Sequence, residues 1–314
     1  KKGEKFSTSC LFCYIFYFLN FCCKIYYMIQ NDLKNVKFGL IGHPLGHSLS
    51  GIIHSAAMKS VGVEGEYLLF DTEPEYLIDQ VKYFKSRNFL GFNVTIPFKV
   101  PITLFLDDVD NLANLISSVN TVKITPDRRL IGYNTDVYGF KNAIPSDFDL
   151  KRKKVALIGL GGASRAILAA FSQIDVDCVD VYVRNVINAN EFLSNFRINF
   201  PNLKVNLFQM QNLKTLEHYK MLVNATPVGM RGHSMDLSPV GEALLETFDK
   251  NGIVYDIIYN PVKTKLIKDA INLSIRTING LDMLVFQAAK AFEIWTGLSP
   301  DVKLMKIAAL EQML

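Results

Sequence analysis

Three short polar motifs in the first half of the chain bring together residue types that could hold a ligand and move a proton on it. They are Asn93-Val94-Thr95-Ile96-Pro97-Phe98-Lys99, Ser118-Val119-Asn120-Thr121 and Gly132-Tyr133-Asn134-Thr135-Asp136. Lys99 and Asp136 can form a charge-assisted hydrogen bond that positions both groups, and amide and hydroxyl side chains can bind the hydroxyls of a ligand. The motifs therefore predict a site for a polyhydroxylated acid, with proton transfer as its chemistry.

Lys99 is the residue that we expect to carry the proton. Most lysines are solvated surface charges, but Lys99 follows the predicted end of a strand at Pro97, and Asn93 and Thr95 precede it at alternate positions. Side chains at alternate strand positions point to the same face, so these groups can line one cleft. Asp136 is the predicted partner of Lys99.

Ser48 and Ser50 are candidates for contact with a ligand carboxylate. Two hydroxyls at positions i and i+2 of an extended loop can point the same way and hold such a group. The alternative is a turn followed by a helix, with Ser50 as the N-cap. The serines alone favour this alternative, and only the presence of the other motifs favours ligand binding.

A glycine-rich turn predicts a nucleotide site in the second half of the chain. Gly159-Leu160-Gly161-Gly162-Ala163-Ser164 follows the apolar strand predicted at Val155–Ile158 and opens a predicted helix. Glycines let the backbone approach a pyrophosphate, and the amides and dipole at the helix N-terminus favour the anion. Such a turn alone is weak evidence, because any tight strand-to-helix connection can contain glycines.

The end of the next predicted strand, Val179–Val183, indicates which nucleotide binds. Sites for NAD usually carry an aspartate or glutamate there, which binds the ribose 2′-hydroxyl. This chain instead has Arg184 and Asn185, and an arginine offers a planar, permanent positive charge for a 2′-phosphate. Arg184 could also be an ordinary solvated arginine, but the lack of an acid favours NADP.

Apolar runs alternate with segments of helical periodicity, which predicts parallel βαβ units. Further predicted strands are Val36–Ile41, Tyr67–Phe70, Leu90–Ile96, Met221–Asn224 and Ile253–Asp256, and the predicted helices are Ser50–Val61, Leu77–Ser86, Ser164–Ile174, Asp282–Trp295 and Pro300–Leu310. A new unit starts near Lys153. The predicted fold class is α/β, with two α/β domains and a cleft between them.

Length and composition narrow the class of protein. A chain of 314 residues forms one large or two ordinary domains, and 49% hydrophobic residues argue against disorder. The net charge of +4 is mild and no basic stripe interleaved with aromatic residues is present, so no nucleic acid is expected as a partner. The histidines lack metal-binding spacing, and Cys10, Cys13, Cys22 and Cys23 match a zinc site poorly, so no metal is expected.

Residues 1–27 differ from the rest of the chain. The apolar and aromatic run Leu11–Leu19 follows three lysines in the manner of a signal peptide, but no cleavage site of small residues follows it. The run is also too short for a membrane span, which needs about 20 residues. The first methionine is Met28, and we expect residues 1–27 to be an extraneous extension, with a membrane anchor as the alternative.

In wording and order, the motifs resemble those of shikimate dehydrogenases, from about Phe38 to about Leu310, and the glycine-rich turn matches the family's Gly-x-Gly-Gly-Ala-Ser-Arg. The family's Asn-Arg-Thr, with a further base three positions after the Thr, is Val183-Arg184-Asn185 with Asn188 here, which leaves one cation to bind the 2′-phosphate. In the serine loop, the usual Ser-Pro and His-Asn are Ser50-Gly51 and His54-Ser55.

The resemblance implies a role for each candidate residue. Lys99 and Asp136 would form an acid–base dyad. Shikimate or 3-dehydroshikimate would be bound by Ser48, Ser50, Thr95, Asn120, Asp136, Tyr259 and Gln287. NADP would contact Gly159, Leu160, Gly161, Gly162, Ala163, Arg184, Asn185, Thr226, Ile257 and Gly280.

The resemblance also divides the chain. Residues 28–136 would form the substrate-binding catalytic domain, residues 137–279 a Rossmann-like NADP-binding domain, and residues 280–314 helices that return to pack on the substrate domain. The implied activity is the reversible NADPH-dependent reduction of 3-dehydroshikimate to shikimate, in the biosynthesis of chorismate and the aromatic amino acids. The expected enzyme is cytoplasmic, without a membrane partner, and a monomer or homodimer.

Two other functions are compatible with these residues. A quinate/shikimate dehydrogenase would use the same polar motifs and would also accept quinate or NAD. The single cation at the 2′-phosphate position, Arg184, is compatible with such relaxed cofactor choice. A non-catalytic nucleotide-binding or regulatory protein could share the fold, but it would not need Lys99, Asp136, Asn120 and Gln287 together.

Overall fold

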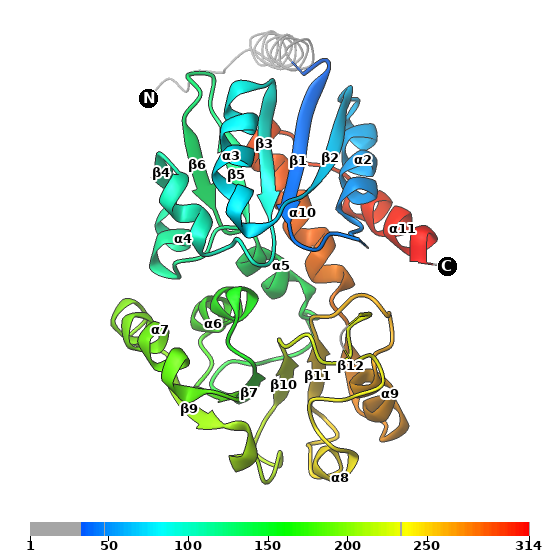
Figure 1. Cartoon of the computed structure of the whole chain (residues 1–314). Helices are drawn as coiled ribbons and strands as arrows, with labels where there is room; N and C mark the ends of the chain where they lie inside the picture. Colours follow the sequence, from blue (N-terminus) through cyan, green and yellow to red (C-terminus); the bar gives the residue numbers. More distant parts are fainter. Residues whose placement is uncertain (1–32, 47, 233, 314) are drawn as a thin grey trace, which may run out of the picture.

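The computed structural model describes residues 33–46, 48–232 and 234–313, and the prediction for residues 1–27 lies outside them. Figure 1 shows an upper and a lower α/β half. In the described residues each half contains a six-stranded sheet, and hydrophobic clusters bury both faces of each sheet. The predicted fold class, two α/β domains, is confirmed. The boundaries at residues 136 and 279 stay a prediction.

The upper sheet has the strand order β2-β1-β3-β5-β6-β4. Its strands are β1 (Val36–Gly42), β2 (Gly65–Asp71), β3 (Phe89–Val94), β4 (Asp108–Val109), β5 (Thr121–Ile124) and β6 (Leu130–Tyr133). β1 pairs in parallel with β2 and β3, but β5 pairs antiparallel with β3 and β6. The predicted parallel βαβ units of β1, β2 and β3 are therefore confirmed. β5 and β6 were not predicted, and the turn between them is too short for a parallel crossover.

The last two helices pack on the upper half. Helices α2 (Ser50–Val61), α3 (Leu77–Ser86) and α4 (Asn111–Leu115), with the 3-10 turns η1 (Pro74–Tyr76) and η2 (Pro101–Phe105), belong to this half by sequence. α10 (Leu281–Thr296) and α11 (Val302–Met313) return to it, and α10 rises from the lower half in Figure 1. Phe292 and Trp295 of α10 share a buried cluster with Ile53 of α2 and Phe38 of β1. The return of the C-terminal helices is confirmed.

The lower sheet is parallel throughout, with the order β12-β11-β10-β7-β8-β9. Its strands are β7 (Lys154–Ile158), β8 (Cys178–Val183), β9 (Lys204–Gln209), β10 (Met221–Asn224), β11 (Ile253–Asp256) and β12 (Arg276–Ile278). This is the doubly wound order of a dinucleotide-binding domain, in which the strand order reverses between the first and fourth strands. That reversal lies between β7 and β10.

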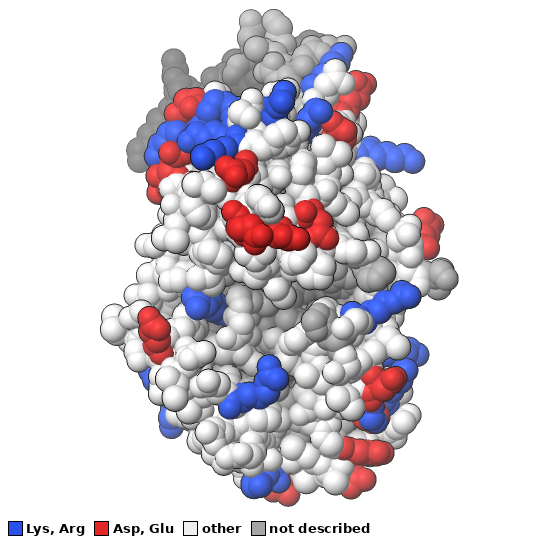
Figure 2. Space-filling model, in the orientation of Figure 1, with Lys and Arg blue, Asp and Glu red and all other residues white. Residues whose placement is uncertain are grey.

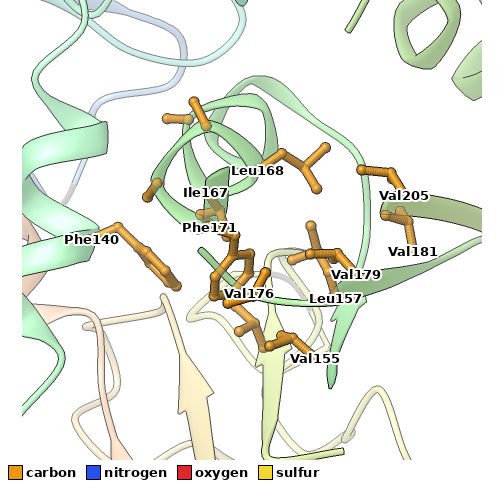
Figure 3. Close-up of a cluster of buried hydrophobic side chains, with 14 of the residues drawn as sticks. Phe140, Val155, Leu157, Ile167, Leu168, Phe171, Val176, Val179, Val181 and Val205 are labelled. Carbon is orange, nitrogen blue, oxygen red and sulfur yellow. The ribbon is translucent and has the colours of Figure 1, made fainter. Parts of the chain in front are cut away.

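The helices of the lower half position the glycine-rich turn. They are α6 (Gly162–Ile174), α7 (Val186–Asn199), α8 (Glu242–Leu245) and α9 (Lys265–Asn272), with the 3-10 turn η3 (Met210–Asn212). Helix α5 (Asp136–Ala143) packs against both α6 and α10. Figure 3 shows Phe171 of α6 and Phe140 of α5 against the strand residues Val155 and Leu157. Strands covered on both faces need continuous apolar sequence, which is why β7 was visible in the sequence. β9 was not predicted.

Candidate active site

Lys99 lies in a turn that follows β3. The strand ends at Val94, before the predicted end at Ile96, because the Thr95 carbonyl accepts a hydrogen bond from Phe98 N at 2.8 Å and the chain turns there. The Lys99 carbonyl accepts a hydrogen bond from Val119 N at 2.7 Å. The second polar motif therefore holds the backbone that carries the lysine.

Lys99 and Asp136 form an ion pair. The distance from Lys99 Nζ to Asp136 Oδ2 is 2.6 Å, and the two side chains are 14% and 7% exposed. Asp136 is the first residue of α5, where the helix dipole favours a negative charge. The pair is shielded from bulk water, which strengthens a charge-assisted hydrogen bond and holds both groups in one geometry.

Asn120 orients the aspartate from the opposite side. Its Nδ2 donates to Asp136 Oδ1 at 2.8 Å and to Thr135 Oγ1 at 2.9 Å, while its Oδ1 accepts from Thr135 N at 2.7 Å. Gln287 of α10 places Oε1 3.3 Å from the Asn120 amide nitrogen. The structure thus brings together four of the predicted residues, and Thr135 is a fifth member that the sequence analysis did not assign.

A second layer of hydrogen bonds links this group to β2. The Tyr67 hydroxyl donates to Asn93 Oδ1 at 2.8 Å, and Asn93 Nδ2 donates to the Asn120 carbonyl at 3.2 Å. Burial raises the Tyr67 pKa well above its usual value, and a hydrogen bond with Ser50 opposes this rise. Sequence reasoning missed Tyr67, because a tyrosine in a strand carries no local signal of such a role.

The serine loop differs from the prediction. Ser50 begins α2 and Leu49 is the N-cap residue, so Ser50 is neither on an extended loop nor the N-cap. The Ser48 hydroxyl accepts a hydrogen bond from Ser50 N at 3.3 Å, which folds the loop into a turn instead. A short polar side chain can satisfy the backbone two residues ahead in this way.

Tyr259 and Thr95 are half-buried. Tyr259 packs against the hydrophobic cluster that contains Leu49. Burial raises its pKa, so its hydroxyl is neutral at pH 7 and can donate a hydrogen bond. Thr95 turns its methyl group toward Gly42. Contact of either side chain with a substrate stays a prediction.

The glycine-rich turn leaves space for a pyrophosphate at the start of α6. Gly159 has a φ of +93°, a conformation that favours glycine, and a Cβ there would lie 2.7 Å from Thr226 Cγ2. A Cβ on Gly161 would meet no atom within 4 Å, so the backbone here is open to a ligand. The helix begins at Gly162, two residues before the predicted start. The N-terminal amides of a helix suit an anion.

Arg184 and Asn185 follow β8 directly. Arg184 is exposed, and in the described part of the chain no hydrogen bond or ion pair engages its guanidinium. The Asn185 side chain is the N-cap of α7, with Oδ1 accepting from Ile187 N at 2.9 Å. The arginine is therefore available to an anionic ligand, while the asparagine oxygen is already occupied.

The remaining predicted cofactor residues lie just after the ends of β10, β11 and β12. Thr226 Oγ1 donates to Asn224 Oδ1 at 2.7 Å, and Asn224 Nδ2 donates to Asp256 Oδ1 at 3.0 Å. Burial raises the Asp256 pKa to about 6. Gly280 lies against the Ile257 carbonyl, because a Cβ on it would be 1.9 Å from that oxygen. All these residues follow the carboxyl ends of parallel strands, where such sheets bind ligands.

The two groups of residues are neighbours. A Cβ on Gly162 would lie 3.4 Å from Lys99 Cβ and Cδ, so the lysine side chain rests against the glycine-rich turn. Figure 2 shows this face hollowed between the halves, with acidic side chains gathered above the hollow and isolated basic ones below it. The arrangement can hold a nucleotide on one side and a proton donor on the other.

The described residues contain neither a metal-binding cluster nor a membrane-spanning helix. Over residues 33–46, 48–232 and 234–313, no group of three or more His, Cys, Asp or Glu side chains could hold a metal ion. Within the same residues, no helix has the length and apolar character that crossing a membrane requires.

The sequence of this chain matches two family models and several named proteins. Residues 40–122 match the family model of the shikimate dehydrogenase substrate binding domain, and residues 280–310 match that of the shikimate 5'-dehydrogenase C-terminal domain. A protein of Methanococcus maripaludis named shikimate dehydrogenase (NADP(+)) is 38% identical over 91% of this chain and 100% of its own length.

Solved structures agree with the sequence relatives. A crystal structure of a shikimate dehydrogenase in complex with NADP+ has a TM-score of 0.81 and 36% identity, covering 90% of this chain and 96% of that one. The Thermus thermophilus enzyme in complex with NADP(H) and shikimate has a TM-score of 0.77 and 35% identity, covering 89% and 100%. The resemblance seen in the motifs is confirmed: the chain belongs to the shikimate dehydrogenase family.

Proposed function

We propose that this protein catalyses the reversible NADPH-dependent reduction of 3-dehydroshikimate to shikimate, in chorismate and aromatic amino acid biosynthesis. The observation that carries the proposal is the shielded pair of Lys99 and Asp136, 2.6 Å apart and next to the start of α6. A ketone reductase needs a proton donor beside its hydride source. The family relatives are named as NADP-dependent shikimate dehydrogenases.

Lys99 is the proposed proton carrier. The chemistry that NADPH supplies when bound is a hydride for the ketone carbon. Lys99 holds a proton at Nζ for the oxygen that becomes the alkoxide, and in the reverse direction Nζ accepts it. Asp136 and Asn120 hold the ammonium and the carboxylate in place through the 2.6 and 2.8 Å contacts.

The remaining residues of the upper half are proposed to bind the substrate. Ser48, Ser50 and Tyr259 offer hydroxyls to its carboxylate, and Thr95 and Gln287 offer polar groups to its ring hydroxyls. Asn120 is 2% exposed, with both ends of its amide bonded inside the protein. Its main role in this proposal is to orient Asp136.

The nucleotide site is proposed to bind NADP. The turn Gly159–Ala163 and the α6 N-terminus hold the pyrophosphate, Arg184 binds the 2′-phosphate, and Asn185, Thr226, Ile257 and Gly280 complete the site. The proposed division assigns residues 28–136 to the substrate domain, 137–279 to the NADP domain and 280–314 to helices on the substrate domain. We propose a cytoplasmic monomer or homodimer.

The dual-specificity alternative is less well supported. The curated relatives with 37% to 40% identity are named for shikimate and NADP(+). A quinate dehydrogenase in complex with NAD is also similar in structure, but at 27% identity. Comparing the purified protein on shikimate and quinate, each with NADP+ and NAD+, decides between the two.

Replacing Lys99 tests the proposal. We expect Lys99→Ala to lower kcat for shikimate oxidation by roughly 100- to 10,000-fold, because general acid–base catalysis contributes about that factor. Steady-state kinetics with NADP+ measure it, and circular dichroism checks the fold. Lys265→Ala is the matched control, since Lys265 also pairs with an aspartate, Asp269, at 2.8 Å on α9. Equal activity of the two variants would contradict the role of Lys99.

A further inference from the structure

The segment 115–119 between α4 and β5 belongs to the upper half by sequence but docks on the lower half. In Figure 1, α4 lies at the lower end of the upper half, above α6 and α7. Ile116 is fully buried in the hydrophobic cluster that α6 forms with the lower sheet. The segment is therefore a fixed contact between the halves.

Side chains of the lower half satisfy three consecutive carbonyls of this segment. Asn199, at the end of α7, donates Nδ2 to the Leu115 carbonyl at 2.9 Å. Arg165 of α6 donates Nη1 to the carbonyls of Ser117 at 3.2 Å and Ile116 at 3.5 Å. Carbonyls at the end of a helix lack hydrogen-bond partners within it, so these side chains supply the donors that the carbonyls at the end of α4 lack.

Arg165 is itself held firmly. Its guanidinium lies over the ring of Phe192 on α7, with Cζ 4.2 Å from the ring centroid. A cation over an aromatic face is attracted to it. The arginine is therefore fixed between α7 and the segment, only one turn into the helix that begins at the glycine-rich turn.

The same segment reaches the catalytic residues. Val119 N donates to the Lys99 carbonyl at 2.7 Å, and the next residue is Asn120, which holds Asp136. The Ser118 hydroxyl donates to the Gly162 carbonyl at 3.4 Å. One stretch of backbone thus touches the glycine-rich turn, the lysine and the amide that orients the aspartate.

We propose that Arg165 is a positioning residue, which sets the placement of Lys99 and Asn120 relative to the glycine-rich turn by holding segment 115–119 against α6. Arg165 acts through the backbone and does not touch the reacting atoms. The inference rests on the proposed function, since the placement matters for catalysis only if Lys99 delivers its proton beside a nucleotide bound at that turn. A displacement of about 1 Å can lower a rate by about a hundredfold.

Three variants test the proposal. Arg165→Ala removes both hydrogen bonds, and Arg165→Lys keeps the charge and one donor. Arg197→Ala is the matched control, because Arg197 of α7 donates Nε and Nη2 to the Val205 carbonyl at 3.2 and 2.9 Å, which is the same chemistry inside the lower half. If Arg165→Ala does not fold, Asn199→Ala loosens the same segment at Leu115.

Kinetics separate positioning from simple stabilisation. In shikimate oxidation with NADP+, we expect Arg165→Ala to lower kcat about tenfold or more, because alignment is lost. The KM for shikimate and the KM for NADP+ should each change less than about twofold, because binding is kept. Arg165→Lys should recover part of kcat, and Arg197→Ala should keep all of it. Equal kcat losses in Arg165→Ala and Arg197→Ala, or a lowered thermal midpoint with unchanged kcat, would overturn the proposal.

Hydrogen exchange tests the same inference without turnover. We expect Arg165→Ala, but not Arg197→Ala, to speed amide exchange in the peptides that cover residues 94–100 and 115–121, because their backbone contacts loosen. Unchanged exchange there would overturn the proposal. A wild-type protein that does not oxidise shikimate would instead refute the proposed function, while the exchange data would still decide whether Arg165 holds the segment.

Discussion

At the scale of single residues, the candidate site is built around one carboxylate whose two oxygens have different partners. Asp136 Oδ2 faces Lys99 Nζ and Oδ1 faces the Asn120 amide, at 2.6 and 2.8 Å. Two donors at fixed angles leave the carboxylate no freedom to rotate. The carboxylate in turn holds Lys99 Nζ at one position, as a proton donor that must meet a substrate oxygen requires.

Arg184 should determine the choice between NADP and NAD. It is exposed at the end of β8, and Asn188 stands where the family has a second base. We expect Arg184→Ala to raise the KM for NADP+ by roughly tenfold to a hundredfold, because a hydrogen bond to a charged group contributes about 1.5–3 kcal/mol. The KM for NAD+, which lacks the 2′-phosphate, should hardly change.

Arg231→Ala is the control for this measurement. Arg231 is an exposed arginine in the loop after β10, so its loss changes the net charge equally. Parallel increases in the KM for both nucleotides in Arg184→Ala would show that the arginine acts on something other than the 2′-phosphate.

At the scale of elements, helix α2 is anchored by a buried histidine. The His54 ring stacks on Tyr67 of β2, with centroids 4.3 Å apart and planes at 4°, and lies 5.3 Å from the Trp295 ring of α10. His54 is fully buried, and burial lowers its pKa from 6.5 to about 3. The interface of α2, β2 and α10 therefore requires the neutral ring.

Acid should weaken this interface. The folded state disfavours the protonated His54 ring. The contribution of the neutral ring to the free energy of unfolding is therefore complete above pH 6.5 and is lost as pH falls toward 3. Between pH 7 and pH 4 we expect the wild type to lose about 3 kcal/mol of unfolding free energy relative to His54→Phe. Urea unfolding at both pH values measures the difference. An identical pH dependence in the two proteins would contradict it, and His218→Phe, at an exposed histidine, is the control.

At the scale of the whole molecule, α5 and α10 form the junction that assembles the site. Asp136 lies on α5 and Gln287 on α10. The helices approach closely at Gly139, where a Cβ would lie 2.6 Å from the Met283 carbonyl oxygen and 2.9 Å from Gln287 Cβ. Neither contact leaves room for a methyl group, so the spacing of α5 and α10 depends on this glycine.

Gly139→Ala should push these helices apart. We expect a loss of about 1–3 kcal/mol in unfolding free energy, as for other overpacked sites, together with a lower kcat/KM for shikimate. Thermal unfolding and kinetics measure the two effects. Gly241→Ala is the matched control, because no atom lies within 4 Å of a Cβ there. An unchanged kcat/KM for shikimate in Gly139→Ala would contradict the idea that catalysis depends on the spacing of α5 and α10.

The sequence by itself determined the residue types of the site and the class of fold. Apolar strands such as β7, the glycine-rich turn and the arginine after β8 are local signals, because backbone conformation and burial on two faces constrain neighbouring residues. The motifs around Lys99, Asn120 and Asp136 also carried the family resemblance. None of these inferences required knowing which strands pair.

Only the tertiary structure decided how these residues meet. The antiparallel pairing of β5, the turn at Ser48, and the roles of Tyr67 and Arg165 depend on contacts between residues far apart in the chain. Arg165 and Ser117, for example, are 48 positions apart. Such contacts are set by strand order, register and packing of the whole core, which no local pattern of residues encodes.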